Sequence, residues 1–202
     1  MKAYRVHEYG NAAKFIEDEV NKPSAKKGHV VVKVKASSLN PIDHKLLKGD
    51  LGINPALPGI LHMDVAGVIT EVGEGVTAFK TGDEIYGCAG GLQGEAGNIE
   101  GALADFMLAD SNLIALKPKS LSFSESAALP LVTITAWEGL FDRAHIKKED
   151  HVLIHGGTGG VGHIAIQLAR KHGARVATTV SSEDKAKVAR GLGAEDIIFY
   201  RD

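Results

Sequence analysis

The residues with the clearest chemical meaning are the glycines between Gly156 and Gly162, which follow the apolar run 152–154. In a strand-to-helix turn with the spacing G-x-G-x-x-G, the first glycine permits the tight turn and the second lets the backbone approach a pyrophosphate. The third lets helix and strand pack closely, and the first N–H groups of the helix face the phosphates. The pattern therefore predicts a dinucleotide site, with a glycine-rich turn that binds nothing as the alternative. Its expected contacts are Gly157, Thr158, Gly159, Gly160, Val161 and Gly162.

The choice of nicotinamide cofactor is expected to depend on the end of the second strand. An acidic residue there would bind the ribose 2′-hydroxyl of NAD and repel the 2′-phosphate of NADP. This chain has Ser181 at that position, and Lys185 adds a positive charge one turn later, which favours NADPH. A helix cap at Ser182 with a solvated Lys185 is compatible with the same residues. Glu183 and Asp184 weaken the argument, because their carboxylates could face the same pocket.

The elements that must position this turn are predicted from a change of period along the chain. From about residue 123, short apolar strands alternate with helices, which is typical of a parallel sheet. The predicted strands are 151–154, 175–179 and 197–200, and the predicted helices are 131–143, 161–171 and 183–190, after a shorter helix capped by Ser124. Before residue 120 the pattern predicts strands at 30–35, 64–72, 84–86, 104–109 and 113–116, and a helix at 42–48.

These elements predict an α/β chain with a β-rich domain over 1–122 and a parallel-sheet domain over 123–202. The segment from Gly87 to Gly101 is rich in glycine and is expected to be a mobile loop.

Charge and cysteine content exclude several classes of protein. The 23 Lys and Arg residues nearly balance 25 Asp and Glu residues, which disfavours nucleic acid or an anionic membrane as the main partner. The one cysteine, Cys88, excludes an internal disulfide framework and a zinc site built from cysteines. The N-terminus lacks the apolar region of a signal peptide, and no apolar run reaches the roughly 20 residues of a membrane span. We therefore expect a reduced, cytoplasmic protein.

Further blocks lie in order along nearly the whole chain. They are Ser38 to Asp43, Asp64 to Val68, Val72 to Val76, Gly82 to Gly87, Ala128 to Pro130, Thr135 to Glu138 and Gly156 to Gly162. Together they resemble the medium-chain dehydrogenase/reductase superfamily, in its zinc-free quinone oxidoreductase branch. The resemblance implies a GroES-like catalytic domain followed by a Rossmann domain, with the active site in the cleft between them.

The resemblance also implies roles for individual residues. Asn40 is expected to contact the nicotinamide or the substrate, and Thr135 the cofactor. Ser181, Lys185 and Tyr200 match the positions that hold the 2′-phosphate in relatives specific for NADPH.

The chain departs from related groups in three ways. Zinc-dependent members have a cysteine where Asn40 stands and a His-Glu pair near His62 and Met63, so no metal site is expected. Enoyl-thioester reductases of the superfamily carry a tyrosine after the Asn-Pro-x-Asp helix, where this chain has the tyrosine-free run 49–52. The family's chains also continue well beyond a third Rossmann strand. We therefore expect a truncated, partial Rossmann domain with one βαβαβ unit.

The residues and the resemblance together predict a zinc-independent oxidoreductase that transfers hydride from NADPH to a quinone or to a conjugated carbonyl such as an enone or enal. The full-length form is expected to be a homodimer with a small-molecule substrate. Two alternatives are a non-catalytic NADPH-binding module and a truncated, inactive remnant. A half Rossmann sheet is expected to bind NADPH weakly, to turn over slowly and to self-associate through its open edge.

Overall fold

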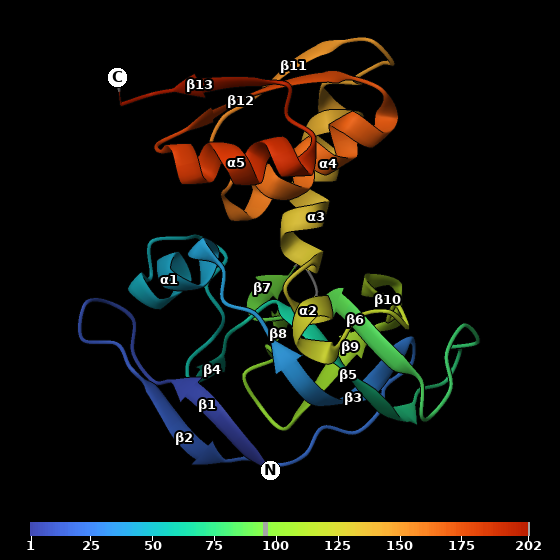
Figure 1. Ribbon diagram of the computed structural model, residues 1–202. Helices are drawn as coiled ribbons and strands as arrows, with labels where there is room; N and C mark the ends of the chain where they lie inside the picture. The colour runs from blue at the N-terminus through green and yellow to red at the C-terminus, as the bar shows by residue number, and fades with distance from the viewer. Residues whose placement is uncertain (95–96, 202) are drawn as a thin grey trace. The chain divides into compact units, whose positions relative to one another are not determined.

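The computed structural model describes residues 1–94 and 97–201, which divide into two compact units, Met1–Leu131 and Val132–Asp202. The first unit consists mainly of antiparallel strands, and the second contains a parallel sheet with helices (Figure 1). Each unit has its own cluster of buried apolar side chains. Among the described residues, no helix is both long enough and apolar enough to cross a bilayer.

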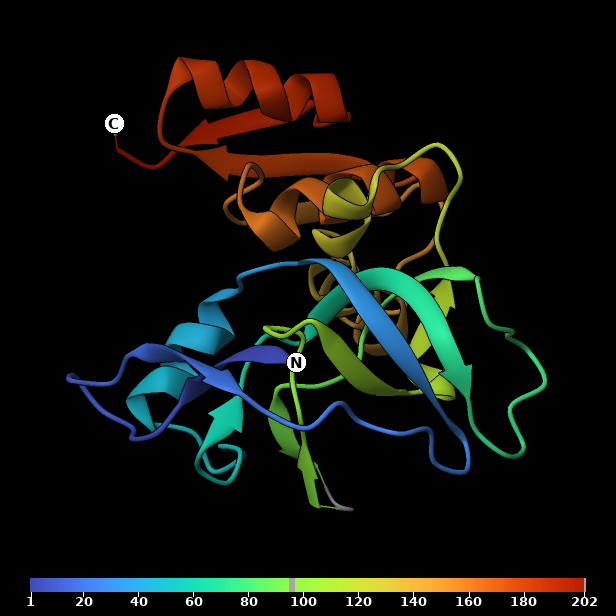
Figure 2. The ribbon, with the colours of Figure 1, turned by 90° about the horizontal axis from the view of Figure 1, so that it is seen from below.

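A five-stranded antiparallel sheet forms the centre of the first unit. Its order is β10 (Ile114–Leu116), β6 (Glu84–Cys88), β5 (Asp64–Val72), β3 (His29–Ser37) and β9 (Phe106–Asp110). The two longest strands, β3 and β5, run side by side (Figure 2). Because alternate residues of a strand point to the same face, Val30 and Val32 of β3 share the core with Val65 and Ile69 of β5. The predicted strands of this domain are therefore confirmed, with ends shifted by a few residues.

A smaller sheet, which the sequence did not predict, has the order β2 (Phe15–Glu19), β1 (Lys2–Val6) and β4 (Gly59–Ile60). Between β3 and β4 in the sequence lies α1 (Pro41–Lys48), close to its predicted range. Asn40 caps its start and Pro41 occupies its first position. Gly49 ends the helix with a φ of 80°, a left-handed conformation that glycine adopts without strain.

The segment from Gly87 to Gly101 is not a loop throughout. It contains a two-stranded hairpin of β7 (Leu92–Gly94) and β8 (Gly97–Ile99), although residues 95 and 96 lie outside the described residues. The expectation of a loop was wrong here because glycines at a hairpin turn give the same sequence signal as glycines in a loop.

The first compact unit includes the short helix α2 (Phe123–Ala127), which packs against β3 and β5, and extends to Leu131. The domain boundary after residue 122 stays a prediction. Ser122, and not Ser124, caps α2: its hydroxyl accepts from the Glu125 N–H, and the Glu125 carboxylate accepts from the Ser122 N–H. Ahead of this segment, the 3₁₀ turn η1 (Ser111–Leu113) joins β9 to β10.

The second unit confirms the predicted alternation of strands and helices. Its parallel sheet has the order β11 (His151–Ile154), β12 (Arg175–Val180) and β13 (Asp196–Phe199). The connecting helices are α4 (Gly160–His172) and α5 (Glu183–Leu192). Ahead of them, α3 (Pro130–Trp137) continues into a π-helical segment, η2 (Glu138–Arg143), where the sequence predicted one helix.

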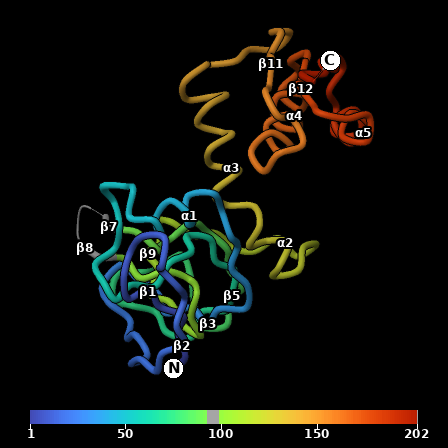
Figure 3. Tube along the Cα trace, turned by 90° about the vertical axis from the view of Figure 1, so that its left-hand side faces the viewer, coloured from blue at the N-terminus to red at the C-terminus, as the bar shows by residue number. Residues whose placement is uncertain are grey.

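Helices α4 and α5 lie on the same face of the parallel sheet (Figures 1 and 3). Ile154, Val176 and Val180 point to that face and are buried in the core. Leu153 and Ile198 alternate with core residues and remain 49% and 45% exposed. Since parallel sheets are usually covered on both faces, these two side chains mark an incompletely covered surface.

The contact between β3 and β5 gives a test of the fold. An ideal Cβ on Gly67 would lie 2.4 Å from the Lys33 carbonyl oxygen and 2.7 Å from Val32 Cγ1. We expect Gly67→Ala to lower the free energy of unfolding by about 1–3 kcal/mol, because backbone must move to make room. Urea titration followed by far-UV circular dichroism measures this. In the control Gly52→Ala, the added methyl meets nothing within 4 Å. Equal stability of the two variants would contradict the strand contact.

Candidate functional site

The predicted dinucleotide turn is held in place by the neighbouring strand β12. The Gly156 N–H donates to Thr179 Oγ1 at 2.9 Å, and the Gly157 N–H donates to the Thr179 carbonyl at 3.2 Å. Thr178, fully buried, donates from its hydroxyl to the Ile154 carbonyl at 2.6 Å, just before the turn. Sequence reasoning missed both threonines, although their place in a buried strand was the available signal.

The glycines of the turn fall into two groups. An ideal Cβ on Gly157 would lie 2.1 Å from Thr178 Oγ1, and one on Gly162 would lie 2.3 Å from the Gly156 carbonyl oxygen. These two positions need glycine for packing within the chain. On Gly159 the nearest atom would be 3.2 Å away, and on Gly160 it would be 3.3 Å away. Each of these two Cβ positions would meet a single atom of the chain, closer than an ordinary van der Waals contact, so the crowding is milder than at Gly157 and Gly162.

The first turn of α4 exposes backbone donors. Its N-cap residue, Gly159, has no side chain, whereas Ser122 and Ser182 cap α2 and α5 with their hydroxyls. The first backbone bond of the helix runs from the His163 N–H to the Gly159 carbonyl at 3.0 Å. The N–H groups of residues 160–162 come before that bond, and they have no acceptor among the described residues. Thr158 precedes them, half-buried in the turn. Such N–H groups at the positive end of a helix dipole fit a pyrophosphate.

Of the three residues expected at a 2′-phosphate, Ser181 and Tyr200 follow neighbouring strands and Lys185 lies in the first turn of α5. Ser181 follows β12, and Lys185 Nζ donates to Ser181 Oγ at 3.0 Å. Tyr200 follows β13 and is 57% exposed, and its backbone N–H donates to the Val180 carbonyl at 3.3 Å. Because β12 and β13 are parallel, their carboxyl ends meet at one edge of the sheet. The fold therefore brings Ser181, Lys185 and Tyr200 to the same edge.

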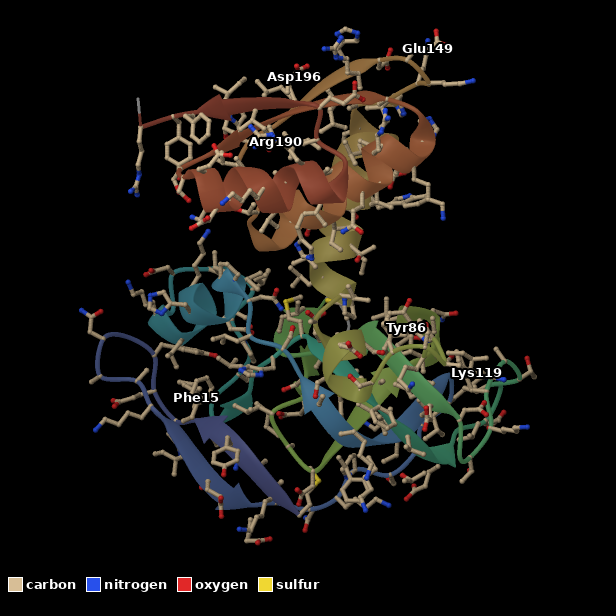
Figure 4. All side chains as sticks on the ribbon, viewed as in Figure 1. Phe15, Tyr86, Lys119, Glu149, Arg190 and Asp196 are labelled. Carbon is tan, nitrogen blue, oxygen red and sulfur yellow. The ribbon has the colours of Figure 1, made fainter. Side chains whose placement is uncertain are left out.

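The acidic residues that could oppose this phosphate have basic partners on α5. The Glu183 carboxylate pairs with Arg190 at 2.9 Å, and the Asp184 carboxylate pairs with Lys187 at 3.2 Å (Figure 4 labels Arg190). All four side chains are exposed, so each pair adds little stability. The pairs nevertheless place a positive charge beside each carboxylate. Lys185 takes no part in these two pairs and donates to the Ser181 hydroxyl.

In the first unit, Asn40 belongs to a buried polar cluster. The residue is only 6% exposed, and its N–H donates to Asp43 Oδ2 at 2.7 Å in the capping box of α1. Its side-chain nitrogen donates to Ser38 Oγ at 3.1 Å and to Asp64 Oδ2 at 2.9 Å. A buried amide held by two acceptors has a fixed orientation.

Asp64 is the acceptor around which this cluster is arranged. It is fully buried, and besides Asn40 it accepts from the Ser38 hydroxyl at 2.7 Å and from the Leu131 N–H at 2.9 Å. Burial raises the pKa of its carboxyl group, while these hydrogen bonds act in the opposite direction. Sequence reasoning treated Asp64 only as the start of a strand, because its partners lie far away in the sequence.

The remaining titratable groups of this region are also shifted by burial. Burial raises the pKa of Asp43 and lowers the pKa of His62. His62 adopts a φ of 70°, and its Nδ1 lies 3.1 Å from Ser37 Oγ. Across the described ranges, no three His, Cys, Asp or Glu side chains gather as ligands for a metal ion.

Thr135 lies in the second unit, on α3, where Val132 and Ala136 are buried and Thr135 itself is exposed. A separate cavity of about 710 Å³ in the first unit lies between the segment 20–26 and β9. Neither Asn40 nor Asp64 lines that cavity, so it is not part of the polar cluster.

The environment of Cys88 gives a test of this cluster. Burial and the neighbouring Asp64 carboxylate raise the pKa of its thiol to about 12, compared with about 8.5 for a free cysteine. At pH 8.5 we therefore expect iodoacetamide to alkylate the folded chain on the order of 1000-fold more slowly than the urea-unfolded chain, since only the thiolate reacts. Mass spectrometry at timed intervals measures both rates. Rates within tenfold of each other would show that Cys88 is not buried beside Asp64.

Comparison with known proteins finds one family match in each unit. Residues 26–119 match the family described as alcohol dehydrogenase GroES-like domain, and residues 160–202 match the family described as zinc-binding dehydrogenase. These matches confirm the predicted order of a GroES-like domain followed by a Rossmann sheet.

Individual relatives agree with these matches. The chain is 40% identical over 204 residues to a 2-methylene-furan-3-one reductase of Solanum lycopersicum, covering 99% of this chain and 52% of the relative. It is 34% identical over 203 residues to a quinone oxidoreductase of Rattus norvegicus, covering 100% of this chain and 59% of the relative. The crystal structure of Escherichia coli quinone oxidoreductase complexed with NADPH superimposes with a TM-score of 0.84 at 29% identity, covering 100% of this chain and 59% of that one. The chain thus spans between half and two thirds of the length of these proteins.

Proposed function

The chain belongs to the medium-chain dehydrogenase/reductase superfamily, and we propose that it serves an NADPH-dependent oxidoreductase that transfers hydride to a quinone or to another conjugated carbonyl. The main support for this proposal lies at the carboxyl end of the parallel sheet. There α4 begins without a side-chain cap, and the Lys185 ammonium group donates to the Ser181 hydroxyl. Backbone donors suit a pyrophosphate, and the lysine suits the additional phosphate of NADPH.

The class of acceptor is supported by the relatives. One is named for the reduction of a methylene-furanone and another for the reduction of quinones, and both substrates contain a carbonyl conjugated to a carbon–carbon double bond. Such acceptors take hydride without a metal ion to polarise an isolated carbonyl. No group of described side chains has the arrangement of metal ligands, so we propose that the reaction is independent of zinc.

Each named residue has a separate task in this proposal. Bound NADPH would supply the hydride, and the chain would bind and orient it. The N–H groups at the start of α4 would hold the pyrophosphate, where Gly159 and Gly160 carry no side chain that would stand between them and the ligand. Ser181, Lys185 and Tyr200 would hold the 2′-phosphate. Asn40 and Thr135 would contact the reacting end of the cofactor or the substrate.

The function is tested by mixing the chain with NADPH and a panel of quinones, enones, enals and simple aldehydes. Absorbance at the nicotinamide band then follows consumption of NADPH. Turnover with conjugated carbonyls but not with simple aldehydes supports the proposal. Bound NADPH with no turnover of any acceptor would favour a non-catalytic binding module, and no binding would favour an inactive remnant. The homodimer and the cytoplasmic location stay predictions.

Cofactor preference is expected to depend on Lys185. NADPH should bind more tightly than NADH, and Lys185→Ala should reduce the difference by about 1.5–3 kcal/mol, the range for a hydrogen bond to a charged group. Quenching of Trp137, the one tryptophan of the chain, measures both dissociation constants. Lys187→Ala is the matched control, because Lys187 lies on the same helix but pairs with Asp184. Equal affinities of the parent for the two cofactors would refute the assignment.

Turnover is expected to survive removal of metal ions. Asn40 replaces a cysteine ligand, and its amide is engaged by Ser38 and Asp64 instead of facing a metal. We therefore expect the same rate before and after exhaustive dialysis against EDTA, measured in the NADPH assay. A loss of activity that zinc restores, and magnesium does not, would show that the region of Asn40 and His62 had been misinterpreted.

A further inference from the structure

We propose that Arg190 is a positioning residue for cofactor specificity: it holds the Glu183 carboxylate on the side of α5 opposite Lys185, so that Glu183 does not oppose the 2′-phosphate of NADPH. The identity of the ligand rests on the proposed function, whereas the arrangement of the charges rests only on contacts within the second unit.

Glu183 is the residue of this region that could reverse the cofactor preference. Strand β12 ends at Val180, Ser182 caps α5, and Glu183 is the first residue of the helix. The carboxylate thus belongs to a residue close to the strand end where an acidic group binds the ribose 2′-hydroxyl of NAD. A Glu183 side chain free to turn toward Ser181 would repel a 2′-phosphate and favour NADH.

The contacts of α5 place these acidic and basic side chains on opposite sides of the helix. Glu183 Oε1 accepts from Arg190 Nη1 at 2.9 Å, and the two residues are about two turns apart, so their side chains share a face. Lys185 follows Glu183 by two residues, or roughly 200° around the helix. Its Nζ reaches back to Ser181 Oγ at 3.0 Å. The carboxylate is therefore held away from the lysine that is expected to meet the phosphate.

The partner of Glu183 is well suited to holding a carboxylate. A guanidinium is always charged and offers several N–H donors in one plane. Arg190 also lies in the last turn of α5 and Glu183 in its first turn, so the helix dipole favours each charge where it stands. Asp184, by comparison, pairs with a lysine three residues later, and its side chain is 92% exposed, against 59% for Glu183.

The alternative is that Arg190 itself attracts the phosphate. The two roles differ in how they depend on Glu183. A direct ligand would raise the affinity for NADPH whether or not the carboxylate is present. A positioning residue matters only while Glu183 carries its charge, so replacing Glu183 by an uncharged residue must abolish the effect of Arg190.

A double-mutant cycle separates these roles, with quenching of Trp137 as the measurement. The quantity compared is the ratio of the dissociation constants for NADH and NADPH. We expect Arg190→Ala to lower this ratio roughly two- to fivefold, the range of one exposed charge pair, and Glu183→Gln to restore it in the Arg190→Ala background. A loss that persists in the double variant, or no loss in Arg190→Ala, would overturn the proposal.

Arg170→Ala is the matched control, because it also breaks an exposed pair of arginine and glutamate in this unit. Its partner, Glu195, precedes β13 and so lies at the amino end of the sheet, opposite the end where the phosphate is expected. The ratio of this control should equal that of the parent. If Arg190→Ala fails to fold, as far-UV circular dichroism would show, Arg190→Gln takes its place with the same expected results.

The arrangement of the charges is tested without a cofactor by NMR on the whole chain labelled with ¹⁵N-arginine. We expect the Arg190 Nε–H to give a higher heteronuclear NOE than that of the exposed Arg143, and Glu183→Gln to lower it. An Arg190 side chain as mobile as that of Arg143 would refute the pairing and with it the proposal. A parent that binds neither NADPH nor the fragment 2′-AMP would refute the proposed function, while the NMR result would still decide the pairing.

Discussion

The polar cluster of the first unit depends on one fully buried carboxyl group, that of Asp64. Removing a charge from water costs several kcal/mol unless hydrogen-bond donors replace the lost solvent. For Asp64 these donors come from Ser38, Asn40 and Leu131, which lie on both sides of it in the sequence. The segment after β3 and the start of α3 must therefore meet the first residue of β5.

Local signals in the sequence predicted the elements that have them. The apolar run of β11, the glycines at positions 49 and 173 that end two helices, and the turn at Gly156 to Gly162 depend on neighbouring residues alone. Strand β2 was missed because nearly all of its residues are exposed, so it has no alternating pattern. The contacts of Asp64 were missed for a different reason: its partners lie 24 to 67 residues away, and no short pattern records them.

The two candidate regions, each described within its own unit, differ in their chemistry. The end of β12 combines a mobile, charged lysine with a hydroxyl, which suits the strong attraction of a phosphate and tolerates small errors in position. Around Asn40 the partners are buried and include the carboxyl groups of Asp43 and Asp64, so a network within the first unit fixes the direction of each hydrogen bond.

The hydrogen bonds from β12 to the glycine-rich turn also have a thermodynamic consequence. A loop of glycines has more conformational freedom than any other sequence, and a ligand that must order it loses affinity in proportion. Here hydrogen bonds within the chain, from Gly156 and Gly157 to Thr179 and from Thr178 to Ile154, hold the backbone at the start of this turn. The entropy of ordering this part of the turn is therefore lost when the protein folds and does not reduce the affinity for a ligand.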